Sequence, residues 1–292
     1  MTERTATITG REDTEALRNL FEFVNGIRGV DFALYRQATV TRKLGLRLEE
    51  TRTYNCREYL SYLKAHPEEL DNLIRALTIK VSNFFRNPLV FELLEAFILP
   101  ELIAQFRSLS VWSLGCANGE EPYSIAMLAH ELLKREKERF DVNILGMDIC
   151  EGAVDNAVRG EYPAGELLEV KKKYMDAFFD RVLRPGGHPH EHESLYRITD
   201  TIKEMVKFEC GDIAGRLKSG KVKSGSFNLI LCRNVLIYMN RALQTEIAGN
   251  IRDILKTDGY LIIGESETVP EIFRKDFVQT FPGVKIYRKR RA

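Results

Sequence analysis

The sequence has no excess of charge and no long apolar segment. Its 292 residues carry 43 Lys+Arg against 42 Asp+Glu, a formal net charge of +1. That balance excludes a bulk attraction to nucleic acid or to an anionic membrane, although charge can still be separated locally. No apolar run approaches the roughly 20 residues that span a bilayer. The N-terminus, MTERTATITGREDTE, lacks the apolar stretch of a signal peptide. We therefore expect a cytoplasmic protein, without membrane insertion or nucleic-acid binding, and a monomer.

Cysteines are few, odd in number and widely spaced. No C-x-x-C pair occurs, which argues against a disulfide framework or a zinc site. We expect reduced thiols that pack as small apolar side chains. A nucleophilic Cys116 is the alternative, but no His stands in a recognisable partner motif. The five residues are Cys56, Cys116, Cys150, Cys210 and Cys232.

The first part of the chain has helical periodicity and no alternating run. A hydrophobic fraction of 44% and a charged fraction of 29% exclude disorder. Leu17, Leu20, Phe21 and Val24 recur at intervals of three and four residues, and three similar stretches follow up to residue 87. Residues 1–88 are therefore predicted to form an all-helical N-terminal domain and linker.

Short apolar runs that alternate with helical stretches follow this segment. Such alternation predicts βαβ units and a doubly wound, Rossmann-like α/β domain over residues 89–292. Residues 284–288 alternate as a half-buried edge strand should. Two β-prone runs flank a Pro/Gly-rich turn, which predicts a small antiparallel β insert at about 178–206. The five core runs are 111–115, 142–148, 206–210, 227–232 and 260–264.

The segment GCANGEEPYSIA, residues 115–126, follows the first predicted strand. Gly115 lets the backbone approach a ligand closely, and Pro122 suits the first turn of a helix. The segment is not the G-x-G-x-x-G fingerprint of a dinucleotide site. Glu120 and Glu121 stand where such a site holds pyrophosphate, and they would repel a phosphate. They suit a ligand with a cationic amine and no phosphate, such as S-adenosylmethionine.

Two further acids end predicted strands. Asp148 follows the second strand, where a carboxylate can accept hydrogen bonds from both ribose hydroxyls. Asp212 follows the third, near the expected position of an adenine edge. Helix capping is the alternative for each carboxylate. Their order along the chain favours a nucleoside site.

Three blocks make the sequence similar to the chemotaxis receptor methyltransferase (CheR) family over about residues 17–287. They are SNFFR at 82–86, GEEPYS at 119–124 and CRNVLIY at 232–238. The resemblance implies a helical N-terminal domain, a class I methyltransferase domain and an inserted β-subdomain. It also implies methyl transfer from S-adenosylmethionine to glutamate side chains of transmembrane chemoreceptors. The alternatives are a methyltransferase with another substrate and an inactive S-adenosylmethionine-sensing module.

The same resemblance implies roles for individual residues. Glu121 would hold the methionine amine, Asp148 the ribose, and Asp212 with Ile213 the adenine. An ionised glutamate is its own nucleophile, so neither a general base nor a metal is expected. Arg86 would steer the carboxylate and Tyr238 would orient it, a salt bridge and a core aromatic being the respective alternatives. The linker and the loop after the fourth strand would complete the cofactor site through Ser82, Arg86, Arg233 and Asn234.

Two segments depart from the family pattern. Lys80 occupies a place commonly held by Asn, so that cofactor contact is not carried over. The insert has a Pro-Gly-Gly-His-Pro-His turn in place of Gly-x-Gly, which argues against tethering of a receptor pentapeptide. His188, His190 and His192 alternate in this turn. We interpret them as a solvated loop, with a metal site as the alternative.

Arg36, Lys43 and Arg47 lie near one line on a predicted helix. A solvated face is one interpretation. The resemblance favours the other, a docking surface for an acidic receptor bundle.

Overall fold

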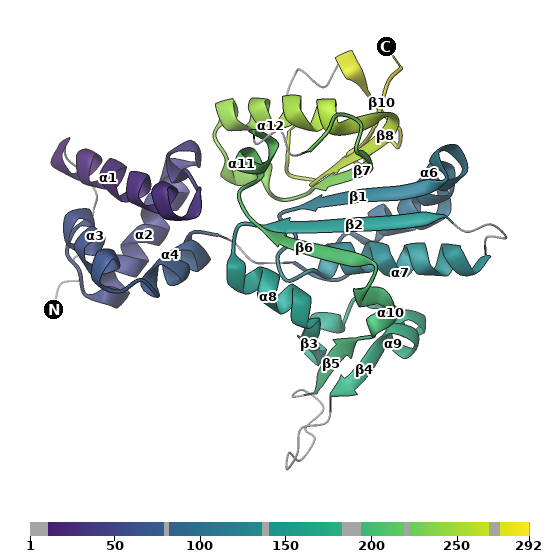
Figure 1. Ribbon diagram of the computed structural model, residues 1–292, viewed down its shortest axis with the longest axis horizontal. Coiled ribbons are helices and arrows are strands. Elements are labelled where there is room, and N and C mark those ends of the chain that lie inside the picture. Colours follow the sequence, from purple (N-terminus) through teal and green to yellow (C-terminus); the bar gives the residue numbers. More distant parts are fainter. Residues whose placement is uncertain are drawn as a thin grey trace.

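The computed structural model describes residues 11–78, 82–135, 140–182, 194–218, 222–268 and 275–291. The first four α-helices make up the predicted helical N-terminal part and lie to one side of the sheet in Figure 1. They enclose their own core, which includes Leu20, Leu44, Leu63 and Leu73. The first helix continues through Gly26 and ends at Arg28. Gly29 follows it with a backbone φ of +69°. The bounds are α1 (Arg11–Arg28), α2 (Gln37–Thr51), α3 (Cys56–Ala65) and α4 (Glu69–Leu77), with a 3₁₀ turn η1 (Phe32–Leu34) before α2.

The central sheet has the order β6-β2-β1-β7-β8-β10-β9. Its first five strands are parallel, which confirms the α/β prediction. The predicted edge strand instead lies between β8 and β9 and is antiparallel to both. Alternation shows that a strand is half-buried but does not reveal a three-residue neighbour such as β9. The bounds are β1 (Ser108–Leu114), β2 (Asp141–Asp148), β6 (Val206–Cys210), β7 (Phe227–Cys232), β8 (Leu255–Ile263), β9 (Phe277–Gln279) and β10 (Ile286–Lys289).

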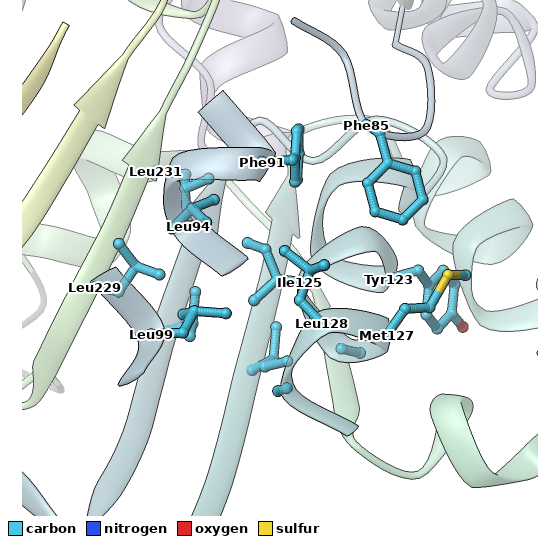
Figure 2. Packing of buried hydrophobic residues seen from close by; sticks show 14 of the residues in the cluster. Phe85, Phe91, Leu94, Leu99, Tyr123, Ile125, Met127, Leu128, Leu229 and Leu231 are labelled. Atoms are coloured by element: carbon cyan, nitrogen blue, oxygen red, sulfur yellow. The ribbon is translucent and has the colours of Figure 1, made fainter. Parts of the chain in front are cut away.

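Helices cover both faces of this sheet because successive strand residues point to opposite sides. Leu229 and Leu231 pack against helices on one face, where Ile125 and Leu99 meet them (Figure 2). These helices are α5 (Pro88–Leu93), the π-helical turn η2 (Leu94–Ile98), α6 (Leu99–Phe106) and α7 (Glu120–Arg135). The alternate strand residues, such as Trp112 and Ile230, face α11 (Ile213–Lys218) and α12 (Arg241–Ile254). No helix in the described ranges is long and apolar enough to cross a membrane.

A second, antiparallel sheet has the order β3-β5-β4. The predicted hairpin is present as β4 and β5, and β3 adds a strand that precedes the expected range. Phe84 joins this sheet to the main core, since its ring lies edge-on to Tyr162 at 4.8 Å and to Phe179 at 5.5 Å. The Pro/Gly-rich turn with His188, His190 and His192 lies outside the described residues, as does Lys80. The bounds are α8 (Glu151–Arg159), β3 (Glu161–Pro163), η3 (Ala164–Leu167), α9 (Lys172–Phe178), β4 (Phe179–Val182), β5 (Leu195–Ile198) and α10 (Asp200–Lys203).

Candidate cofactor site

A pocket lies beyond the carboxyl ends of β1, β2, β6 and β7, where doubly wound sheets bind ligands. About 640 Å³ of free space, including the open space at its mouth, lies between its lining residues. Six of its lining residues were predicted from the sequence: Gly115, Asp148, Asp212, Ile213, Asn234 and Tyr238. The helical domain adds Tyr35, Leu77 and Thr78, which sequence reasoning missed. The site is therefore shared between the two parts of the chain.

Gly115 is required by the shape of the pocket wall. Its φ is +72°, and a Cβ placed there would lie 2.4 Å from Cγ2 of Val235. The N–H groups of Gly115 and Cys116 both donate to the carbonyl of Met147, at 2.8 and 3.0 Å. A side chain at position 115 would push the β1 loop and the β7 loop apart.

The two strand-ending aspartates are held by backbone N–H groups. Asp148 accepts hydrogen bonds from Ala117 N and Cys150 N, both at 2.9 Å, one on each carboxylate oxygen. Asp212 Oδ2 accepts one from Gly215 N at 2.8 Å, in the first turn of α11. The two carboxylates therefore cap local structure and also line the pocket. Since a carboxylate offers about four acceptor positions, each can accept further hydrogen bonds from a ligand.

Glu121 lies in a buried network with Arg233. Its carboxylate accepts hydrogen bonds from Ser113 Oγ at 2.8 Å and from Arg233 Nη1 at 3.0 Å. Nη2 of Arg233 donates to the carbonyl of Arg86 at 2.8 Å and to Oδ1 of Asn87 at 2.5 Å. The Arg233 side chain is 3% exposed. It therefore fastens the linker to the sheet, and it is not itself part of the described pocket lining.

Charge in the pocket favours a ligand with hydroxyl donors and a positive group. Asp148 and Asp212 contribute carboxylates, whereas no Lys or Arg stands among the described lining residues. Such a lining repels phosphate and attracts a cation. The two acceptor carboxylates and the wall at Gly115 thus fit the nucleoside and sulfonium of S-adenosylmethionine.

The positive charge of Arg86 acts on the phenol of Tyr238. Burial raises the pKa of the Tyr238 phenol, and the positive charge of Arg86 opposes that rise. The phenol stays protonated at neutral pH and can donate a hydrogen bond. Ser82 is half-buried in the linker and does not line the pocket.

Glu267 is a site residue that sequence reasoning missed. It is 1% exposed, and its carboxylate accepts four backbone hydrogen bonds. Oε2 accepts from Asn234 N at 2.9 Å and Gly264 N at 2.5 Å, while Oε1 accepts from Val235 N at 2.8 Å and Leu236 N at 2.7 Å. This carboxylate fixes the loop that carries the pocket residues Asn234, Val235, Tyr238 and Met239. An acid soon after Gly264, at the end of a predicted strand, was the available signal.

Glu120 differs from Glu121 in its surroundings, and neither residue is part of the pocket lining. It is 1% exposed and interacts with Asn118, Glu166 and Tyr162 beside the small sheet. Burial raises its pKa to about 7. Because consecutive helix residues point about 100° apart, only Glu121 can join the Arg233 network.

Replacing Glu120 by Gln should remove a pH-dependent loss of stability. The pKa of Glu120 is 4.5 in the unfolded chain and about 7 in the folded protein, so the folded state holds the proton more tightly. The stability that this proton contributes is fully present below pH 4.5 and is lost as pH rises through about 7. We expect the difference in free energy of unfolding between Glu120→Gln and the parent, measured by urea denaturation, to shift in favour of the variant by up to about 3 kcal/mol between pH 5 and pH 8. Identical pH dependence in both proteins would contradict the assignment, and Glu22→Gln on exposed α1 is the control.

The expected docking face on α2 requires correction. Nζ of Lys43 donates to the carbonyls of Leu77 and Thr78 at 3.2 and 3.1 Å, at the end of α4. Nη2 of Arg47 bonds both carboxylate oxygens of buried Glu69 at 2.6 Å. Lys43 and Arg47 share a face of α2, but this face packs on α4, so these two cations hold the helical domain together. Arg36 does not continue this line, because it precedes α2 as an N-cap residue with an extended backbone, and it is exposed.

All five cysteines are free thiols. Burial raises the pKa of Cys116 well above its usual range, which disfavours the reactive thiolate. Within the described residues, no group of three or more His, Cys, Asp or Glu side chains is arranged to hold a metal ion.

Comparisons with known proteins agree on one family. The family model for the CheR methyltransferase SAM-binding domain matches residues 80–282, and that for the CheR all-alpha domain matches residues 15–78. A chemotaxis protein methyltransferase of Listeria monocytogenes is 31% identical over 82% of this chain and 85% of its own length. One of Borreliella burgdorferi is 27% identical over 87% of this chain and 88% of its own. WspC of Pseudomonas aeruginosa, a probable biofilm formation methyltransferase, is 26% identical over 82% of this chain and 54% of its own.

Proposed function

The chain belongs to the CheR methyltransferase family, whose members bind S-adenosylmethionine, and we propose that it methylates glutamate side chains of chemoreceptors. The product would be a glutamyl methyl ester that serves sensory adaptation. The observation that carries this proposal is the pocket at the strand ends, where two carboxylates and a glycine wall meet Tyr238. The chemotaxis methyltransferases among its relatives support the choice of substrate.

Each part of the cofactor has a matching group in the chain. Asp148 would accept the ribose hydroxyls, and Asp212 with Ile213 would hold the adenine. Glu121 would bind the methionine amine, and its bonds to Ser113 and Arg233 fix its orientation. Asn234 and Gly115 would form the adjoining wall, completed by Ser82 and Arg86 from the linker.

Catalysis by this arrangement would consist of alignment and desolvation. S-adenosylmethionine supplies, when bound, a methyl group activated by a positively charged sulfur. A substrate glutamate is ionised at neutral pH, so the chain need not remove a proton. Arg86 would attract the carboxylate by charge. Tyr238, kept protonated, would donate a hydrogen bond to one oxygen and leave the other aimed at the methyl carbon.

Methyl transfer can be tested directly with tritiated S-adenosylmethionine and cytoplasmic receptor fragments. Base-labile label on a glutamate supports the proposal. Label on other residue types only, or no labelled protein although the cofactor binds, contradicts it.

WspC motivates a second candidate, methylation of a signalling protein outside chemotaxis. Base-labile label on such a partner but on no chemoreceptor would favour that candidate.

Arg36, just before α2, is the one cation of the predicted docking face that is exposed, and it tests a docking role. Arg36→Glu should lower the rate of receptor methylation about three- to tenfold, because an acidic partner loses an exposed cation. Affinity for S-adenosylhomocysteine should not change. Arg57→Glu, at an exposed position of α3, is the matched control. Equal methylation rates for both variants and the parent would show that Arg36 is a solvent-exposed residue without a role in docking.

A further inference from the structure

The helical domain is joined to the loop of Tyr238 by backbone hydrogen bonds. The N–H of Arg36 donates to the carbonyl of Tyr238 at 2.8 Å, and the N–H of Asn240 donates to the carbonyl of Leu34 at 2.9 Å. Tyr35 and Met239 form the antiparallel bridge between these bonds. The backbone of residues 34–36 is thus fixed at the rim of the pocket, and the Tyr35 side chain lines it.

The surroundings of Tyr35 combine an aromatic wall with two acids. Its ring packs against Phe32 with centroids 5.2 Å apart, and it contacts the apolar clusters of both domains. Burial raises the pKa of the phenol, and the negative charges of Asp212 and Asp148 raise it further. The hydroxyl is therefore a hydrogen-bond donor at neutral pH, near the two carboxylates assigned to the nucleoside.

We propose that Tyr35 is a nucleoside-binding residue, contributed by the helical domain to the S-adenosylmethionine site. The inference rests on the proposed residue assignments at Asp148 and Asp212. The planar ring of Tyr35 offers a face on which the adenine base can stack or the ribose can pack. The phenolic hydroxyl can bond the carboxylates or the ribose.

This placement links cofactor binding to the position of the helical domain. Leu77 and Thr78, which end α4, line the same pocket, and Lys43 holds their carbonyls. A bound nucleoside would therefore touch both parts of the chain. Its contacts would favour the arrangement in which residues 34–36 remain bonded to the Tyr238 loop. A bound cofactor would therefore stabilise this position of the helical domain.

Isothermal titration of the full chain with S-adenosylhomocysteine tests the proposal. Tyr35→Ala should weaken binding about tenfold or more, equivalent to about 1.4 kcal/mol. Tyr35→Phe keeps the ring and should weaken it at most about fivefold. Tyr54→Ala, 84% exposed in the same domain, is the control and should bind as the parent does. Should Tyr35→Ala fail to fold, Tyr35→Leu keeps most of the buried volume and carries the same expectation.

Adenosine and methionine, titrated separately, locate the effect. Loss of adenosine affinity with methionine affinity retained supports contact at the nucleoside. Unchanged affinity for S-adenosylhomocysteine in Tyr35→Leu, combined with a lower melting temperature, would show a purely structural residue and overturn the proposal. If Asp148→Asn still loses binding in that case, the cofactor site stands without Tyr35. If neither substitution affects binding, the pocket assignment itself fails.

Discussion

Asp148→Asn should abolish measurable binding of S-adenosylhomocysteine, with an affinity at least about 100-fold below that of the parent. The native carboxylate accepts one backbone N–H on each oxygen, from Ala117 and Cys150. An Asn side chain has one acceptor oxygen, so its NH₂ group must face one of these donors. The ribose hydroxyls also lose a charged acceptor. Hydrogen bonds to charged groups contribute about 1.5–3 kcal/mol each, and two such losses account for the expected effect.

Calorimetry of the purified variants measures this result. Asp155→Asn is the matched control, since Asp155 lies exposed on α8 and leaves the pocket lining unchanged. Circular dichroism and a thermal scan establish that Asp148→Asn is folded. A folded Asp148→Asn protein that binds within threefold of the parent would refute the assignment of Asp148 to the ribose.

The sequence predicted the part of the site that follows from strand order. Residues that end parallel strands meet at one edge of a sheet, so Gly115, Asp148 and Asp212 could be expected together before any coordinates. The G-E-E-P-Y-S block located the first turn of α7. The family resemblance assigned the methionine amine to Glu121 alone, whereas the residue pattern by itself does not separate Glu120 from Glu121. That separation depends on which side the small sheet packs, and the contacts of Tyr162 decide it.

The residues that were missed reach the pocket through tertiary contacts. Tyr35 follows a 3₁₀ turn with no periodic signal, and it lines the pocket because residues 34–36 pair with residues 238–240. The same limit explains the error on α2. Helical spacing placed Lys43 and Arg47 on one face, but only the packing of α4 shows that this face is internal.

Glu267→Gln should lower the kcat of methyl transfer about 100-fold. Each oxygen of the native carboxylate accepts two N–H groups, so an amide leaves one pair of buried donors facing its own NH₂. Two unsatisfied donors cost about 2–5 kcal/mol, and the loop can escape that cost only by moving. Because the loop carries Asn234 and Tyr238, this movement misaligns the substrate, and a shift of about 1 Å can cost a factor of about 100 in rate.

A purely structural Glu267 would give a different pattern. In that case the melting temperature falls, while kcat per folded molecule and KM for the receptor stay at the parent values. If Glu267 positions the loop, kcat falls at a temperature where the protein is fully folded, and affinity for S-adenosylhomocysteine changes less than tenfold. Glu265→Gln is the matched control, because Glu265 stands in the same segment, is exposed and accepts a hydrogen bond from Nδ2 of Asn87 at 2.9 Å. Equal kcat values for Glu265→Gln, Glu267→Gln and the parent would show that the loop keeps its alignment without the buried carboxylate.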